Sequence, residues 1–413
     1  MSELLRIARL GSGGDGVADR AGSPVFVPFA LPGELVEVEG EGEGARLLSV
    51  REASAERIEP VCRHFGDCGS CSLQHLEEQG YRAWKRERVV AALASAGIEA
   101  DVAPLVPCAP RSRRRVAFTA RLVEKGALLG FNRVRSHAIV DLGENWIALP
   151  QIVDAMPALR TLVERIAKTR DSFRLSVTAT ASGLDVAAEG SGKLDDRARR
   201  VAADHAVSIG LARLTVDGEI VLEPRKPVVM MGKAAVHLAP GGFLQAVAET
   251  EDAMAALVTA HFAKARHVAD LFAGAGAFTF RLAETARVHA VESDAQAIAV
   301  LDRAARSTPG LKPITPERRD LFRRPLTAKE LSAFDAVVFD PPRAGAEAQA
   351  REIAKSPVPR VAAVSCNPAT LARDLKLLIT AGYRLTSVTP LDQFLWSSHV
   401  EAVALLEKPK TRR

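Results

Sequence analysis

The stretch HVADLFAGAGAF, residues 267–278, points most directly to the fold class, because an apolar strand runs straight into two closely spaced glycines. Glycine allows the backbone to turn sharply and to approach a bound ligand closely. A helix is expected from about 277 to 286, and the next apolar strand, 287–292, ends in the acid Glu292. An acid in this place can hold the two hydroxyls of a ribose. The pattern predicts a parallel, Rossmann-like α/β sheet that binds a nucleoside at its carboxyl edge.

The chemistry of this turn favours one class of cofactor over another. A nicotinamide-binding turn has a third glycine, whereas Phe278 stands two residues after Gly276, and no phosphate-binding loop is evident. S-adenosylmethionine, an adenosyl cofactor without a pyrophosphate, therefore fits better. The alternative is a tight turn with no cofactor. The acid and two prolines of 340–342 follow another apolar strand, 336–339, and predict a stiff loop at the same edge of the sheet.

The residues that precede this sheet have a different pattern of apolar residues and turns. Residues 1–53 hold short apolar stretches between glycine-rich turns, the pattern of a small β-barrel. We expect four parts, namely this barrel (1–53), a cysteine segment (54–79), a central α+β domain (80–240) and the α/β domain (241–413). Other expected elements are a helix at 77–98 that buries Trp84, Val89, Val90 and Leu93, a strand at 115–123, a helix at 151–168, strands at 173–181 and 220–224, a charged helix or loop at 195–200, and strands at 361–365 and 402–406.

Composition excludes several classes of protein. The 413 residues are 47% hydrophobic and 25% charged, which is typical of a globular protein and argues against global disorder. No apolar run approaches the roughly 18 residues of a membrane span. Residues 1–10 carry scattered charges unlike a signal peptide, so a cytoplasmic protein without a membrane partner is expected.

Charge points to a polyanionic partner. The net charge is +5, and arginines cluster at 111–115 and 318–324. The clusters fit a surface that follows a phosphate backbone, although each could be a solvated basic face.

Three of the five cysteines lie close together, with the spacing Cys62-x5-Cys68-x2-Cys71. An odd number of cysteines in a cytosolic chain disfavours a disulfide framework, so the spacing indicates metal binding. Structural zinc sites prefer two close ligand pairs, and only one is present, which favours a [4Fe–4S] cluster. A fourth ligand is not obvious. Cys108 could supply it, or the cluster could have three protein ligands or be absent.

Cys366 follows the apolar strand 361–365 and precedes Asn367 and Pro368. A lone cysteine in such a place is often a small buried hydrophobe. Here a helix N-terminus and Arg373 are expected to favour the thiolate, which would make Cys366 a nucleophile. His399 and Glu401 precede the last apolar strand, and by themselves they have ordinary structural explanations.

Three motifs together resemble those of the RNA 5-methyluridine methyltransferases. They are SCNPATLARD at 365–374, DPPRAG at 340–345 and HVE at 399–401. The iron–sulfur members that act on 23S rRNA are the most similar, and the resemblance covers nearly the whole chain. GGDG at 13–16 and LPGE at 31–34 resemble the RNA-binding TRAM barrel, and GFLQ at 242–245 resembles the start of the methyltransferase domain.

The resemblance implies a mechanism and a set of site residues. Cys366 would add to carbon 6 of an unpaired or flipped-out uracil, and Glu401 would remove the carbon-5 proton after methyl transfer. Cys62, Cys68 and Cys71 would hold a [4Fe–4S] cluster, whose fourth cysteine in the family corresponds here to Asn145. Ala277 stands where members often have asparagine. The residues expected to line the S-adenosylmethionine site are Gln245, Phe272, Glu292, Asp320 and Asp340.

The expected activity is thus an RNA (uracil-5-)-methyltransferase, a monomer acting on RNA, most simply 23S rRNA. A tRNA-methylating member is one alternative, disfavoured because those relatives generally lack the cysteine cluster. A non-catalytic RNA-binding protein of the same fold is the other, disfavoured by the presence of both Cys366 and Glu401. A cytosine-5 enzyme would tend to have a cysteine where Arg343 follows the two prolines.

Overall fold

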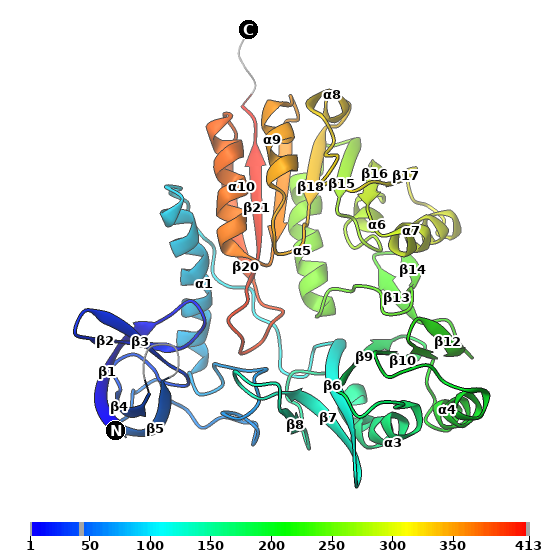
Figure 1. The fold of residues 1–413 in the computed structure, drawn as a ribbon. Helices are drawn as coiled ribbons and strands as arrows, with labels where there is room; N and C mark the ends of the chain where they lie inside the picture. The colour runs from blue at the N-terminus through cyan, green and yellow to red at the C-terminus, as the bar shows by residue number, and fades with distance from the viewer. Residues whose placement is uncertain (1, 41–44, 410–413) are drawn as a thin grey trace.

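The computed structural model describes residues 2–40 and 45–409, and its C-terminal part is built on a seven-stranded sheet (Figure 1). The strand order is β17-β16-β15-β18-β19-β21-β20. The first five of these strands are parallel, and β21 runs antiparallel to both of its neighbours. The expected Rossmann-like α/β fold is confirmed. The strands are β15 (His267–Leu271), β16 (Arg287–Glu292), β17 (Ile314–Arg318), β18 (Ala336–Phe339), β19 (Arg360–Ser365), β20 (Arg384–Leu391) and β21 (Glu401–Glu407).

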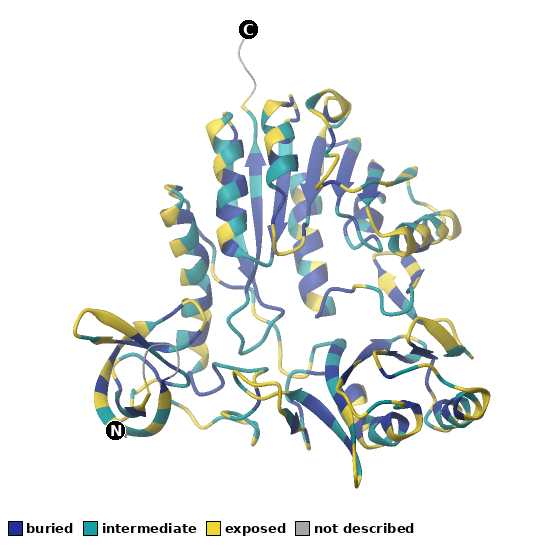
Figure 2. Ribbon diagram, viewed as in Figure 1, coloured by how far each residue is buried: buried dark blue, intermediate teal, exposed yellow. Residues whose placement is uncertain are grey.

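Helices cover both faces of this sheet, because alternate residues of each strand point to opposite sides. Leu271 and Val361 pack with α9, α10 and the earlier helix α1, whereas Val268 and Ala362 pack with α5. The inner strands β15, β18, β19 and β21 are accordingly almost wholly buried, whereas the edge strands β17 and β20 are partly exposed. The helices are exposed on their outer sides (Figure 2). The helices are α5 (Ala248–His261), α6 (Thr279–Leu282), α7 (Ala295–Ser307), α8 (Ala328–Leu331), α9 (Glu347–Lys355) and α10 (Pro368–Thr380).

Helix α6 is much shorter than the 277–286 helix that the sequence predicts. The carbonyl of Ala283 accepts a hydrogen bond from the backbone N–H of Lys312, a distant residue, at 2.7 Å. The chain therefore leaves the helix after one turn and passes into β16.

Five strands at the N-terminus pair in the order β3-β2-β1-β4-β5 and enclose a small apolar core. Strands β3 and β5 lie at the two ends of this order, so hydrogen bonds among the described residues do not close the predicted barrel. The sequence predicts strands at its apolar stretches 4–10, 25–29, 35–38 and 47–50. Strand β2 is not among them, because only Val17 and Ala18 are apolar in it. The strands are β1 (Ser2–Leu10), β2 (Gly16–Arg20), β3 (Ser23–Val27), β4 (Leu35–Glu39) and β5 (Arg46–Glu52).

Helix α1 (Glu78–Ser95) confirms the helix expected at 77–98 and packs against α10 and β20. Its buried face differs from the prediction, since Trp84 and Val90 are only half-buried, whereas Tyr81 and Lys85 are buried. Burial of Lys85 is possible because its ammonium group lies 2.6 Å from Oδ1 of Asp392.

The central part is a second seven-stranded sheet, ordered β12-β11-β10-β9-β6-β7-β8, with three helices. The helix expected at 151–168 is two helices, because Pro157 has no N–H to continue the hydrogen bonding of the first. The elements are β6 (Arg115–Val123), β7 (Gly126–Asn132), β8 (Ile139–Asp141), α2 (Pro150–Asp154), α3 (Met156–Ile166), β9 (Phe173–Thr180), β10 (Gly183–Glu189), α4 (Asp196–Ser208), β11 (Arg213–Val216) and β12 (Glu219–Leu222).

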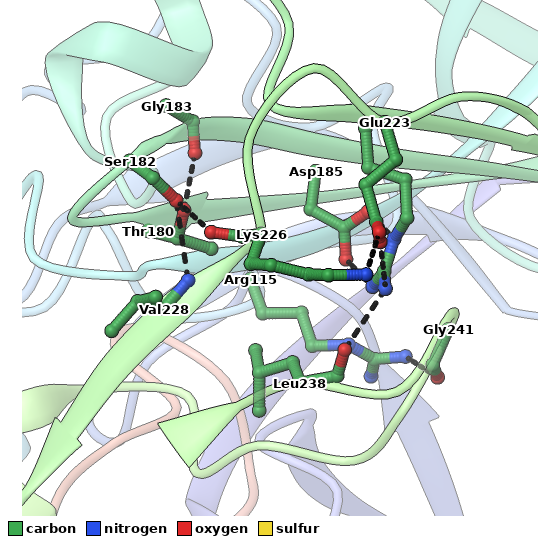
Figure 3. Close-up of polar contacts among 11 residues, drawn as sticks. Arg115, Thr180, Ser182, Gly183, Asp185, Glu223, Lys226, Val228, Leu238 and Gly241 are labelled. Atoms are coloured by element: carbon green, nitrogen blue, oxygen red, sulfur yellow. Dashed lines mark hydrogen bonds and ion pairs between the residues drawn. The ribbon is translucent and has the colours of Figure 1, made fainter. Parts of the chain in front are cut away.

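A hairpin, β13 (Val228–Met231) and β14 (Ala234–His237), leads from the central sheet to the C-terminal one. The segment that follows the hairpin is tied back to the central sheet by arginines. Arg115 donates to the carbonyl of Gly241 at 3.1 Å (Figure 3). Arg213, which pairs with Asp185, donates to the carbonyl of Leu238 at 2.9 Å. In the part of the chain that the structure describes, no helix has the length and apolar character of a membrane span.

Candidate active site

A cavity of about 500 Å³ opens at the carboxyl edge of the parallel strands. Residues at the ends of β15, β16, β18 and β19, in the segment before α5 and at the start of β21 line this cavity. Of the seven residues predicted for catalysis or cofactor binding, six line it. These are Gln245, Phe272, Glu292, Asp340, Cys366 and Glu401.

The turn after β15 forms one wall of the cavity. Phe272 has a φ of +62°, and Gly276 has a φ of +108°. A Cβ on Gly276 would come within 2.4 Å of the Phe280 ring, so only glycine fits there. The backbone N–H of Gly274 donates to Oε2 of Glu292 at 3.0 Å, which fixes the turn against the end of β16.

Glu292 is partly engaged with the backbone. Its Oε1 accepts from the N–H groups of Ser293 at 2.6 Å and Asp294 at 2.8 Å. The Ser293 hydroxyl also donates to Oε1, at 3.0 Å, whereas Oε2 accepts one bond, from Gly274. An oxygen of a carboxylate has two lone pairs, so Oε2 can accept one further bond from a ribose hydroxyl in the cavity.

Asp320 is the predicted cofactor residue that does not line the cavity. Its Oδ1 accepts from the backbone N–H groups of Phe322 at 3.0 Å and Arg323 at 3.3 Å. The turn that it holds places the Phe322 ring in the cavity wall, 5.4 Å from the ring centre of Phe272. The two rings form an aromatic surface suited to an adenine. Ala277 also lines the cavity, with no polar group to offer.

The catalytic candidates lie on neighbouring strands. Cys366 follows β19, and the buried Glu401 begins β21, the strand paired with β19. Asn367 caps α10 and also donates from its side chain to the carbonyl of Arg343 at 3.1 Å. The cysteine loop and the acid-proline loop are thereby held together.

The electrostatics of Cys366 differ from the expectation. Burial raises the pKa of its thiol to about 11, and the nearby carboxylates of Glu401 and Asp340 add to that shift. Arg373, expected to favour the thiolate, instead pairs with Asp374 at 2.8 Å. Arg343 is the cation that lowers the pKa of Cys366. The thiol is therefore protonated in the free protein at neutral pH.

Two acids of the cavity, Asp340 and Glu401, hold protons unusually tightly. Burial raises the pKa of Asp340 to about 7, opposed by the hydrogen bond that Gln245 donates to it. Burial and the charge of Asp340 raise the pKa of Glu401 to about 8, opposed by a hydrogen bond from Gln393. A carboxyl group with a pKa near neutrality is suited to general-base work.

Sequence reasoning missed Arg343 as a charge partner and Gln393, Phe394 and Phe322 as cavity residues. The only local signal is that Gln393 and Phe394 lie shortly before Glu401. The arginine run at 111–115 also differs from the predicted basic face. Arg114 is buried and pairs with Glu251 at 2.6 Å.

The cysteine segment does not form a metal site as folded. Cys62, Cys68 and Cys71 interact electrostatically, and burial raises the pKa of each thiol. However, the described ranges 2–40 and 45–409 contain no group of three or more His, Cys, Asp or Glu residues arranged to hold a metal ion. Asn145, in the place of the family's fourth cysteine, uses its side-chain oxygen to accept from two backbone N–H groups at 2.9 Å each. Cys108 lines a different cavity.

Comparisons with known proteins agree with this geometry. A family model described as tRNA (uracil-5-)-methyltransferase matches residues 229–409. An uncharacterized RNA methyltransferase of Mesorhizobium japonicum is 57% identical over 413 residues, which covers 100% of both chains. The 23S rRNA (uracil(1939)-C(5))-methyltransferase RlmD of Halomonas elongata is 34% identical, covering 99% of this chain and 90% of that protein.

A solved structure shows the same fold. The Pyrococcus abyssi tRNA (uracil-54, C5)-methyltransferase in complex with S-adenosyl-L-homocysteine has a TM-score of 0.74 to this chain and 22% sequence identity. The match covers 98% of this chain and 99% of that one.

Proposed function

This chain belongs to the RNA (uracil-5-)-methyltransferase family, and on that premise we propose that it methylates carbon 5 of a uridine in 23S rRNA by covalent catalysis. One observation carries the proposal. Cys366 and Glu401 line the same cavity as the cofactor candidates Glu292 and Asp340. A nucleophile, a base and a methyl donor can therefore reach one uracil ring.

The choice of 23S rRNA rests on the 34% identity to RlmD over nearly the whole chain. The likeness to the Pyrococcus abyssi enzyme concerns the fold and does not favour tRNA as the substrate.

The residues divide the chemistry between them. Carbon 5 of uracil is a weak nucleophile towards a methyl sulfonium, and addition of the Cys366 thiolate to carbon 6 would create an enolate that is nucleophilic at carbon 5. The thiol must first lose its proton, and Arg343 is the cation that favours this loss. After methyl transfer, the Glu401 carboxylate would take the carbon-5 proton. The double bond then reforms and the thiolate leaves.

The cofactor side of the cavity suits S-adenosylmethionine. Glu292 would accept hydrogen bonds from the ribose, and the rings of Phe272 and Phe322 would hold the adenine. Asp320 would act through the turn that positions Phe322. Gln245 and Asp340, joined by a hydrogen bond of 2.9 Å, would face the remaining polar end of the cofactor.

Trapping of the covalent adduct tests the proposal directly. Fluorine at carbon 5 cannot leave as a proton does, so RNA with 5-fluorouridine at the target should remain bound to the protein when S-adenosylmethionine is present. Peptide mapping should place the adduct on Cys366. Cys366→Ala should neither methylate nor trap, whereas Cys108→Ala should do both. Methylation by Cys366→Ala would refute the covalent mechanism.

The [4Fe–4S] cluster is a separate prediction from the sequence and takes no part in these steps. Its support is the sequence spacing of Cys62, Cys68 and Cys71. Iron and sulfide analysis after anaerobic purification tests it, with Cys71→Ala as the variant that should lose the metal. If the protein purified without oxygen contains no iron, the cluster prediction is wrong.

A further inference from the structure

A second cavity, of about 300 Å³, adjoins the catalytic one. Gln393 and Phe394 line both cavities, so they form a shared wall. Other walls of the second cavity come from Arg113 and His399. Because nucleotides are covalently linked, an RNA strand whose uridine enters the catalytic cavity has its neighbouring phosphates close to this wall.

Three arginines from separate segments approach this place. Arg88 lies on α1, Arg113 precedes β6, and Arg343 follows β18. Across the described residues, none of the three forms an ion pair with a carboxylate, whereas the adjacent Arg114 does.

Arg88 and Arg113 are partly buried, and burial lowers the pKa of both. Arg113 donates to the backbone carbonyls of Arg115 at 2.9 Å and Gln393 at 3.5 Å, and Arg88 lies 5.4 Å from the centre of the Trp84 ring. These contacts bring no negative charge, so an anionic ligand would be favoured beside both arginines.

The arginines converge on the loop between β20 and β21. The Arg113 guanidinium lies 5.9 Å from the centre of the Phe394 ring, and the His399 ring lies 5.6 Å from that centre in an edge-to-face arrangement. Burial lowers the pKa of Arg88, and the positive charge of Arg343 lowers it further. Charges of one sign repel each other, so an anion bound beside them would be favoured.

The pKa of the His399 imidazole is also affected by these arginines. Burial lowers the pKa of His399, so the ring is neutral at neutral pH. Four cations lower that pKa further, and they are Arg343, Arg88, Lys85 and Arg113. Lys85 is compensated by Asp392, which leaves the three arginines as the unpaired charges.

We propose that Arg88, Arg113 and Arg343 form a binding site for a phosphate group of the RNA strand, next to the uridine that enters the catalytic cavity. This inference rests on the proposed function for the identity of the polyanion. Guanidinium groups bind phosphate oxygens in pairs, which fixes orientation as well as position. The neutral His399 ring can donate one N–H to the same phosphate. The site would hold the backbone while the base lies against Cys366.

Salt-dependent binding of a short oligouridylate tests this site without knowledge of the natural target. Each phosphate contact to a single strand contributes a slope of roughly −0.7 to log K against log salt concentration. Arg88→Gln, Arg113→Gln and Arg343→Gln should each weaken binding several-fold and flatten this slope. In methylation assays on a 23S rRNA transcript, Arg88→Gln and Arg113→Gln should raise KM more than they lower kcat. Arg343→Gln should raise KM and also lower kcat, because Arg343 favours the Cys366 thiolate as well. Arg303→Gln, an exposed arginine of α7, is the matched control and should change neither.

The outcomes separate the phosphate site from the proposed function. Wild-type affinity and slope in all three variants would overturn the phosphate site, as would an equal loss in the Arg303 control. Arg343 is exposed, so Arg343→Gln carries the test if Arg113→Gln impairs folding. If the slopes flatten but the wild-type protein methylates no RNA, the proposed function fails and the phosphate site stands. If methylation occurs with unchanged slopes, only the phosphate site fails.

Discussion

The side-chain nitrogen Nε2 of Gln393 lies 2.7 Å from Oε2 of Glu401 and donates a hydrogen bond to it. The same nitrogen lies 2.9 Å from Oε1 of Gln245, and Gln245 in turn donates to Asp340 at 2.9 Å. All four side chains line the catalytic cavity. The chain of amides therefore connects the proposed base with the acid at the end of β18, and it opposes the burial that raises the pKa of both acids.

Replacement of Gln393 should move the pH dependence of catalysis. The hydrogen bond from Gln393 favours the ionised form of Glu401, so Gln393→Leu should raise the pKa of Glu401 above its value of about 8. Since the base works only when ionised, the rise of kcat with pH should move to higher pH, and the rate at neutral pH should fall by about tenfold. Single-turnover rates between pH 6 and 10 measure this.

Gln349 supplies the control for this experiment. Gln349 lies on α9 and is as buried as Gln393, but its side chain forms hydrogen bonds with the backbone of Leu326. It does not line the catalytic cavity. Gln349→Leu should lower the free energy of unfolding by about 1–3 kcal/mol and leave the pH profile unchanged. An unshifted profile in Gln393→Leu would remove Gln393 as a positioning residue.

The raised pKa of Glu401 should also be visible in stability. A carboxyl group whose pKa rises on folding stabilises the protein at pH values below its unfolded pKa of about 4.5. That contribution is lost as the pH rises through about 8. The free energy of unfolding of the wild type relative to Glu401→Gln should therefore fall over this range, which urea titrations at several pH values can measure.

Glu34 should show the opposite sign. Its hydrogen bonds, chiefly from Arg57, lower its pKa despite burial, so its contribution is present above the unfolded pKa and is lost as the pH falls. The difference between wild type and Glu34→Gln should accordingly shrink in acid. A trend of the same sign in both variants would contradict one of the two assignments, and its direction shows which.

The sequence predicted those parts of the site that depend on local pattern. The turn after β15, Glu292 and Cys366 follow apolar strands, and parallel strands carry their ends to one edge whatever their order. Gln393 and Arg343 could not be assigned in this way. Gln393 reaches the cavity because β21 lies between β19 and β20 in the sheet. The spacing of residues along the sequence does not predict that strand order.

Local charge was misleading for a related reason. The run at 111–115 reads as a solvated surface, but distant residues take up its side chains, Glu251 for Arg114 and the Gly241 carbonyl for Arg115. In the same way, burial in the fold raises the pKa of the Cys366 thiol, and Glu401 of β21 and Asp340 after β18 raise it further, which the sequence next to Cys366 does not reveal.

The rate at which Cys366 is alkylated should depend on pH in the way that its raised pKa predicts. Because only the thiolate reacts, iodoacetamide should modify Cys366 slowly at neutral pH and faster as the pH rises towards about 11. Glu401→Gln removes a negative charge that raises this pKa, so the reaction should be faster in that variant at alkaline pH, where Glu401 is ionised. Peptide-resolved mass spectrometry separates Cys366 from the other four cysteines. Rapid alkylation of the wild type at neutral pH would show that the thiol is already ionised.

The buried ion pair of Lys85 and Asp392 joins α1 to the loop between β20 and β21, and its removal tests whether α1 stabilises that loop. Lys85→Met leaves the buried Asp392 carboxylate without its cation, although the Tyr81 hydroxyl and the Phe394 N–H still donate to it. The variant should cost about 3–5 kcal/mol of unfolding free energy. Arg82→Met, which breaks the exposed pair with Glu78 on the same helix, should cost less than about 1 kcal/mol. Because Asp392 adjoins Gln393, Lys85→Met should also lower methylation at temperatures where the variant stays folded. Equal losses of stability in the two variants would mean that burial of the Lys85 pair has no special role in holding the β20–β21 loop.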